Sequence, residues 1–373
     1  MTPEQLLVAL AARGLPGAPP IRCDEPLDDP SWRWLHAEVE RHRLTGLLAM
    51  AIADGDLAVS EDQDRHAAAR EMAYATHVVA LERILLDIVE RFDAADVAYR
   101  VLKGPAFAHT VYALPEARPF ADIDLLVPGP QLERAGRLLD ELGLPRRVPE
   151  LRRRFDRRFA RTVTRATGVG GYEVDVHRTL ASGPFTFLLD ADELFAHTSS
   201  FDLVGRSIAC FDPTLALVHS CVHLVLGGRP RLLTARDVVE HARLDDVDVA
   251  AVVDVAGRWR LTAVVALALD EAQERIGLDD GGRTELRRQL APSHEEERLL
   301  ADFPVEVGHS DEQALGALAH VPGVRLKASF ALAHAWPARA NLEARGLTRG
   351  SHLRHVARGL LRPGRWPSPT LRS

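Results

Sequence analysis

The sequence has few of the features that mark secreted, disulfide-stabilised or membrane-spanning proteins. It contains only three cysteines, Cys23, Cys210 and Cys221, at spacings that fit neither a disulfide framework nor a zinc motif. No stretch approaches the roughly eighteen uncharged apolar residues of a membrane span, and the first residues show no basic segment followed by an apolar one. We therefore predict a cytoplasmic protein with no signal peptide and no membrane contact.

The chain also lacks a strong charge of either sign. Its formal net charge of -7 over 373 residues produces no overall field that would attract nucleic acid. Arginines nevertheless gather in residues 146–165 and again from Arg339 to the end. Each cluster is either a solvated face or a basic rim that attracts a triphosphate or an anionic acceptor. No aromatic residues interleave with the arginines as in a nucleic-acid-binding module.

Hydrophobic periodicity divides the chain into three regions and predicts a mixed α/β (α+β) fold. Residues 1–75 are predicted to be helical, and residues 76–200 contain the strands of a small mixed sheet. Beyond Ala181 the pattern is again mostly helical, so residues 201–373 are predicted to form a larger helical domain. Within that domain, residues 249–276 carry the pattern of one continuous helix.

Two carboxylates alternate with aliphatic residues in the segment from Ala121 to Val127. In a strand, Asp122 and Asp124 point to the same face, with their Cα atoms about 7 Å apart. Such a pair repels unless a cation lies between its members, and Mg²⁺ prefers carboxylate oxygens. The alternative is an edge strand with a solvated face, because such triplets are common by chance.

A predicted strand that ends at Leu102 leads into Lys103, Gly104 and a short helix. Glycine at a strand-to-helix turn permits a tight bend and a close approach of phosphate to the backbone. Lys103 adds a positive charge beside that turn. The alternative is an ordinary turn without a ligand.

A third carboxylate lies downstream, in a predicted hairpin. In the segment Tyr172–His177, the side chains of Glu173, Asp175 and His177 share one face of the strand. Presented from a strand beside that of Asp122, Asp175 completes a metal site and accepts the proton of an attacking hydroxyl. We interpret His177 as a hydrogen-bonded residue that supports Asp175 and does not itself bind metal.

Taken together and in this order, the motifs resemble the DNA polymerase β-like nucleotidyltransferase superfamily, and more closely a family of uncharacterised bacterial nucleotidyltransferases. The resemblance is carried by these residues: Leu102-Lys103-Gly104, Tyr112, Arg118, Asp122-Ile123-Asp124-Leu125-Leu126-Val127 and Val174-Asp175-Val176-His177. Softer similarity covers most of the rest of the chain. One departure is Pro105, because the superfamily usually has serine or glycine there, and proline removes one N–H donor.

The resemblance implies transfer of a nucleoside monophosphate from an NTP, ATP by default, to an acceptor, with release of pyrophosphate. By this resemblance Asp122, Asp124 and Asp175 are the catalytic residues and hold Mg²⁺, or Mn²⁺ in its place, in a two-metal mechanism. Lys103, Gly104 and Arg118 are then expected to bind the nucleotide. A small-molecule or peptide acceptor is favoured over nucleic acid. The alternative is a non-catalytic nucleotide-binding or scaffolding protein that retains the fold.

One histidine pair has the spacing of a metal site. His219 and His223 lie four residues apart on one face of a predicted helix, a spacing that can hold zinc. No third ligand is evident nearby, since Cys221 lies on another part of the helix surface. We interpret the pair as packed residues or as the lining of a pocket.

Overall fold

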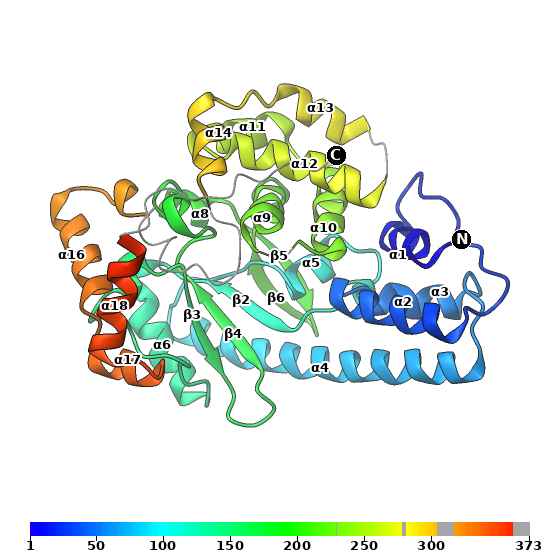
Figure 1. Ribbon diagram of the computed structural model, residues 1–373, viewed down its shortest axis with the longest axis horizontal. Coiled ribbons are helices and arrows are strands. Elements are labelled where there is room, and N and C mark those ends of the chain that lie inside the picture. Colours follow the sequence, from blue (N-terminus) through cyan, green and yellow to red (C-terminus); the bar gives the residue numbers. More distant parts are fainter. Residues whose placement is uncertain (229, 278–280, 304–316, 361–373) are drawn as a thin grey trace.

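A six-stranded mixed sheet forms the centre of the protein (Figure 1). The computed structural model describes residues 1–228, 230–277, 281–303 and 317–360. The strands are β1 (Arg100–Val101), β2 (Asp122–Leu126), β3 (Thr162–Ala166), β4 (Glu173–His177), β5 (Ser199–Leu203) and β6 (Arg206–Cys210). Their order across the sheet is β3-β4-β2-β1-β6-β5. Strands β2 and β4 pair in parallel, whereas β1 with β2 and β3 with β4 pair antiparallel.

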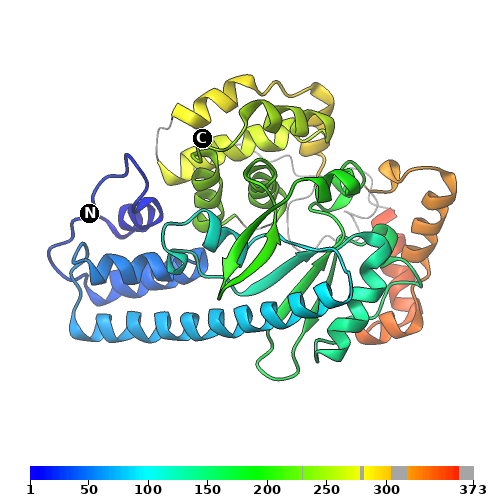
Figure 2. The same cartoon turned by 180° about the vertical axis from the view of Figure 1, so that it is seen from behind.

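Four helices precede the sheet. They are α1 (Pro3–Ala12), α2 (Asp29–His42), α3 (Thr45–Ala53) and α4 (Glu61–Ala94). Ser60 starts α4 with a capping box, in which Ser60 and Gln63 each satisfy a backbone N–H of the other. This 34-residue helix packs against β2 and runs past one side of the sheet in both views (Figures 1 and 2). The predicted helical start of the chain is therefore present.

Short elements connect the strands. They are α5 (Pro105–Thr110), η1 (Pro115–Ala117), η2 (Gly129–Gln131), α6 (Leu132–Glu141), α7 (Asp156–Phe159), η3 (Gly183–Phe187) and α8 (Ala191–Ala196). The apolar face of α6 buries Leu132, Ala135 and Leu139. The same apolar core includes Ile123 and Leu125, which are fully buried behind the carboxylates of β2.

The opposite side of the sheet is covered by helices from later in the chain (Figure 1). These helices are α9 (Pro213–Leu226), α10 (Leu232–Ala242), α11 (Val249–Arg258), α12 (Thr262–Ile276), α13 (Gly281–Gln289) and α14 (His294–Ala301). Three more helices lie at one end of the molecule, beside α6 (Figures 1 and 2): α16 (Val324–Ala335), α17 (Arg339–Ala344) and α18 (Arg349–Leu360). Helices α9, α10 and α12 pack on one another. Among the described residues, no helix combines the length and apolarity that crossing a membrane requires.

The mixed α/β fold class is confirmed, while two details of the sequence prediction are wrong. The single helix expected over residues 249–276 is two helices, because Arg260 adopts a left-handed conformation with φ 54°. The mostly helical pattern beyond Ala181 indicated no strand, yet β5 and β6 form a hairpin, and β6 pairs with β1 through Val101 and Cys210. Continuous elements cross both expected domain boundaries, since residues 75 and 76 lie in α4 and residue 200 lies in β5. The three-domain division stays a prediction.

The two arginine-rich segments lie against each other. The backbone N–H of Ala338 donates to the carbonyl of Leu151 at 2.7 Å, and Asn341 Nδ2 donates to the carbonyl of Pro149 at 2.7 Å. Phe159 and Phe330 share a small apolar cluster there, separate from the main core. The end of the second segment, past residue 360, lies outside the described residues.

Candidate functional site

Pairing of β2 with β4 places two aspartates side by side. The parallel register puts Asp124 opposite Asp175 and Asp122 opposite Glu173. These side chains lie on the face of the sheet away from Ile123, Leu125 and Val174, which are fully buried. The alternation predicted from the sequence is therefore present, and Asp175 lies on the strand next to that of Asp122 and Asp124, as expected.

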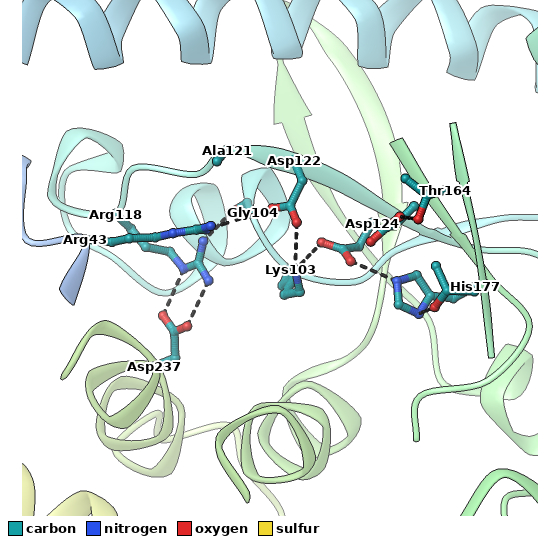
Figure 3. Close-up of polar contacts among 12 residues, drawn as sticks. Arg43, Lys103, Gly104, Arg118, Ala121, Asp122, Asp124, Thr164, His177 and Asp237 are labelled. Carbon is teal, nitrogen blue, oxygen red and sulfur yellow. Dashed lines mark hydrogen bonds and ion pairs between the residues drawn. The ribbon is translucent and has the colours of Figure 1, made fainter. Parts of the chain in front are cut away.

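Asp124 is the electrostatic centre of the site (Figure 3). It is 1 % exposed, and its Oδ2 forms an ion pair with Lys103 Nζ, which lies 3.7 Å from Asp122 Oδ2. Its Oδ1 lies 2.8 Å from His177 Nε2. Burial alone raises the pKa of Asp124, but Lys103 and His177 outweigh burial and hold this pKa well below its usual range. Asp124 is thus ionised at neutral pH.

Two threonines of β3 orient the groups on β4. Thr162 lies opposite His177, and its Oγ1 is 3.1 Å from His177 Nδ1. Thr164 lies opposite Asp175, and its hydroxyl donates to Asp175 Oδ1 at 2.6 Å. The expectation that His177 supports Asp175 is wrong, because its carboxylate partner is Asp124. The threonines were missed, although their alternation with Val163 placed them on one face of the hairpin.

Three of these side chains together offer ligand atoms to a metal ion. One ligand atom each from Asp124, Asp175 and His177 lies within 4.8 Å of the others, and in the described part of the chain this is the only such group. Asp122 does not belong to it. Its Oδ1 lies 3.9 Å from Arg43 Nη1, and its side chain is 25 % exposed. Metal binding by Asp122 together with Asp124 and Asp175 stays a prediction.

The turn at Gly104 requires glycine. This residue has φ 61° and ψ -114° at the start of α5, a conformation that residues with a side chain rarely adopt. A Cβ atom there would lie 3.3 Å from the carbonyl oxygen of Asp122 and 3.5 Å from Phe120. Gly104 thus lets the backbone run close to β2, next to Lys103.

Comparisons with known proteins identify the family of the chain. A family model described as an uncharacterised nucleotidyltransferase matches residues 28–277. The chain belongs to that family. A crystal structure of an antigenic nucleotidyltransferase-like protein from Paracoccidioides brasiliensis is similar at 14% sequence identity and a TM-score of 0.36, and the match covers 58% of this chain and 96% of that one. No curated protein matches.

In this nucleotidyltransferase family member, Arg118 is bound within the protein. Its Nε and Nη2 donate to the two carboxylate oxygens of Asp237 on α10, at 2.9 and 2.8 Å, and Tyr112 also donates to Asp237 at 2.8 Å. Arg118 Nη1 lies 3.4 Å from the carbonyl oxygen of Gly104. Burial lowers the pKa of Arg118, but Asp237 outweighs burial and raises it overall. A nucleotide contact of Arg118 stays a prediction.

The histidine pair of α9 lies beside the same centre. Burial, and then the charge of Lys103, lower the pKa of His219 to about 3 and that of His223 well below its ordinary value. Both imidazoles are therefore neutral at pH 7. His219 Nδ1 is buried without a hydrogen-bond partner in the described part of the protein. Neither histidine belongs to a group of potential metal ligands there, so packing or pocket lining accounts for the pair better than zinc.

Proposed function

We propose that the protein transfers a nucleoside monophosphate from an NTP, ATP by default, to an acceptor nucleophile and releases pyrophosphate. The observation that carries the proposal is the in-register pair of Asp124 and Asp175 on adjacent strands. Membership of a nucleotidyltransferase family supports it. We further propose that the protein works in the cytoplasm on a small-molecule or peptide acceptor.

The donor set fits a hard divalent cation. Asp124 and Asp175 contribute carboxylate oxygens from facing positions, and Asp122 lies on the same face of β2. Mg²⁺, or Mn²⁺ in its place, binds such oxygens and takes further ligands from phosphate. When bound, the ion neutralises charge on the phosphates and helps to align the displacement. His177 then acts chiefly by holding Asp124 through its hydrogen bond at 2.8 Å.

The other residues are assigned by their positions around this pair. Lys103 and the Gly104 turn bind the phosphates, and Arg118 fixes that turn through its contact with the Gly104 carbonyl group. The acceptor hydroxyl forms a bond to the α-phosphorus, and the bond from that phosphorus to the pyrophosphate oxygen breaks. Asp175 accepts the hydroxyl proton. The pyrophosphate leaves with the bonding electron pair.

One observation favours the second candidate, a nucleotide-binding protein without catalysis. Both oxygens of Asp124 already have partners within the chain, Lys103 and His177. A catalytic protein would have to move Lys103 from the carboxylates toward the phosphates when metal and nucleotide bind. In a scaffold, the ion pair between Lys103 and Asp124 would persist.

Asp175→Ala separates the two candidates. The protein is incubated with each α-labelled NTP, Mg²⁺ and a metabolite extract, while label transfer and pyrophosphate release are followed. Loss of a general base lowers turnover by about 10²–10⁴-fold, while NTP affinity measured by calorimetry stays within a few-fold. Thr164→Val, which removes the hydrogen bond to Asp175 but keeps its charge, should lose less activity.

Binding is tested independently by Asp122→Asn combined with Asp124→Asn. The double variant should lose Mg²⁺-dependent NTP binding, because the carboxylate charge that attracts the ion is removed. Unchanged Mg·NTP affinity would overturn the metal assignment. Binding by the wild type without transfer in any extract would favour the scaffold.

A further inference from the structure

Arg161 lies across the carboxylates from the proposed phosphate site. In the strand order β3-β4-β2-β1, Lys103 follows β1, Asp124 and Asp175 lie on β2 and β4, and Arg161 immediately precedes β3 (Figure 1). The carbonyl group of Arg161 accepts a hydrogen bond from the Arg178 N–H at 2.8 Å, which extends the β3–β4 ladder by one residue. Positive groups therefore flank the aspartate pair on both sides.

The guanidinium of Arg161 has no ion-pair partner among the described residues. Its Nη1 donates to the neutral hydroxyl of Ser182 at 3.2 Å, and its Nε is buried without any hydrogen-bond partner. Burial lowers the pKa of Arg161, and the nearby carboxylates Asp124 and Asp175 act to raise it. Neither carboxylate forms a hydrogen bond with Arg161 in the described structure. Arginine stays protonated in proteins, so this is a largely buried charge without a direct counter-ion.

Two further buried polar atoms near this position also lack partners within the described ranges. Thr179 is 2 % exposed and follows His177 by two residues, and its Oγ1 has no hydrogen-bond partner. His219 Nδ1 likewise has no hydrogen-bond partner. The charge of Arg161 is among those that lower the pKa of His219, so the two side chains lie near each other. Buried polar groups are normally satisfied, so several unpartnered ones around one cation indicate a place for a polar ligand.

We propose that Arg161 binds an oxyanion group, a carboxylate or a phosphate, on the acceptor. This inference rests on the proposed transferase function and names the class of its second substrate. The triphosphate is assigned to Lys103 and Gly104 on the other side of the aspartates, which leaves the Arg161 side to the acceptor. A cation held by Asp124 and Asp175 would offset their negative charge. Arg161 would then need an anion from the ligand, and its fork of N–H donors matches one.

The test measures anion binding to the full-length protein. Wild type, Arg161→Gln and Arg161→Lys are titrated by calorimetry with inorganic phosphate and, separately, with sodium acetate. Each titration is done with and without Mg²⁺ and a non-hydrolysable ATP analogue. Arg178→Gln is the matched control. Arg178 also lacks an ion pair in the described structure, donates to the carbonyl group of Ala160 at 2.9 Å and has a buried Nη2 without a partner. Burial alone lowers the pKa of Arg178, whereas Asp124 and Asp175 act on the pKa of Arg161. Circular dichroism confirms that each variant folds.

We expect phosphate or acetate to bind wild type and Arg178→Gln, and to bind Arg161→Gln at least about tenfold more weakly. Arg161→Lys should lie between them, since it retains the charge but not the fork. Affinity for the ATP analogue should stay within about threefold of wild type in all variants. The anion that binds more tightly identifies the oxyanion class.

Two results would overturn the inference. One is a folded Arg161→Gln protein with wild-type affinity for both anions. The other is a loss of ATP-analogue affinity with anion binding unchanged, which would place Arg161 on the triphosphate. Failure of the wild type to bind the ATP analogue would instead refute the proposed function. The titrations without nucleotide would still show whether Arg161 holds an anion.

Discussion

Arg118 and Arg161 both lie near the carboxylates of β2 and β4, and their surroundings differ. Arg118 is 4 % exposed, and it meets both oxygens of Asp237 and the carbonyl group of Gly104. Arg161 donates to one neutral hydroxyl, and its Nε has no partner among the described residues. Burial acts to lower the pKa of both arginines. For Arg118 the carboxylate of Asp237 outweighs burial and raises the pKa overall, whereas the pKa of Arg161 stays lowered.

The difference separates two uses of a buried cation. The counter-charge of Arg118 comes from the chain itself, and the pair joins α10 to the Gly104 turn, so its effect is on stability and on the shape of the turn. Arg161 has no counter-charge of that kind, so its side chain is available to a ligand. Removing Asp237, the partner of Arg118, should therefore lower the free energy of unfolding more than removing Arg161 does.

The largest effect is expected for Asp237→Ala. This variant leaves Arg118 buried without its carboxylate and removes the acceptor of the Tyr112 hydroxyl. Breaking a buried ion pair costs about 3–5 kcal/mol in the free energy of unfolding, measured by urea denaturation at pH 7. Arg118→Met combined with Asp237→Leu should recover most of that loss, because no unpaired charge remains. A loss below about 1 kcal/mol for Asp237→Ala would show that water replaces the carboxylate.

A smaller effect is expected for His219, on the side of Arg161. Its pKa is about 3 in the folded protein, against an ordinary value of 6.5. Below pH 6.5 the unfolded chain therefore takes up a proton that the folded protein does not. As a result, the free energy of unfolding decreases as the pH is lowered. Between pH 6.5 and 5 this contribution is about 2 kcal/mol.

His219→Leu should remove that contribution, seen as a flatter dependence of the free energy of unfolding on pH. His294→Leu is the control, since the side chain of His294 is fully exposed, and it should leave the pH dependence as in wild type. Equal slopes for wild type and His219→Leu would show that His219 becomes protonated in the folded state.

The smallest effect is expected for Arg161→Met in protein without ligand. No ion pair is lost, and a side chain of similar length remains, so the free energy of unfolding should change by less than about 1 kcal/mol. Added phosphate should then stabilise wild type more than the variant, because it binds more tightly where Arg161 is present. A loss as large as that of Asp237→Ala would show that Arg161 has a structural partner and would remove the contrast between the two arginines.

Short-range features of the site could be predicted from the sequence. The alternation of strand side chains placed Asp122 and Asp124 on one face, and a glycine after a strand indicated the turn at Gly104. The mostly helical pattern expected beyond Ala181 is present in helices such as α9 and α16. Such features depend on neighbouring residues, whose spacing the backbone geometry determines.

Contacts between distant segments could not be predicted in this way. His177 bonds to Asp124 across 53 residues, and Arg118 meets Asp237 across 119. Strand β6 joins the sheet beside β1, which no local pattern indicated. The break at Arg260 depends on a single left-handed residue within an otherwise helical pattern.

The sequence by itself thus determined the fold class, the carboxylate strand and the glycine turn. Only the tertiary structure decided which aspartate faces Asp175, which carboxylate His177 holds, and which of the two arginines is left without a counter-charge. The physical reason is that side-chain direction follows from the local backbone period, whereas strand register and the pairing of buried charges depend on how separate elements pack.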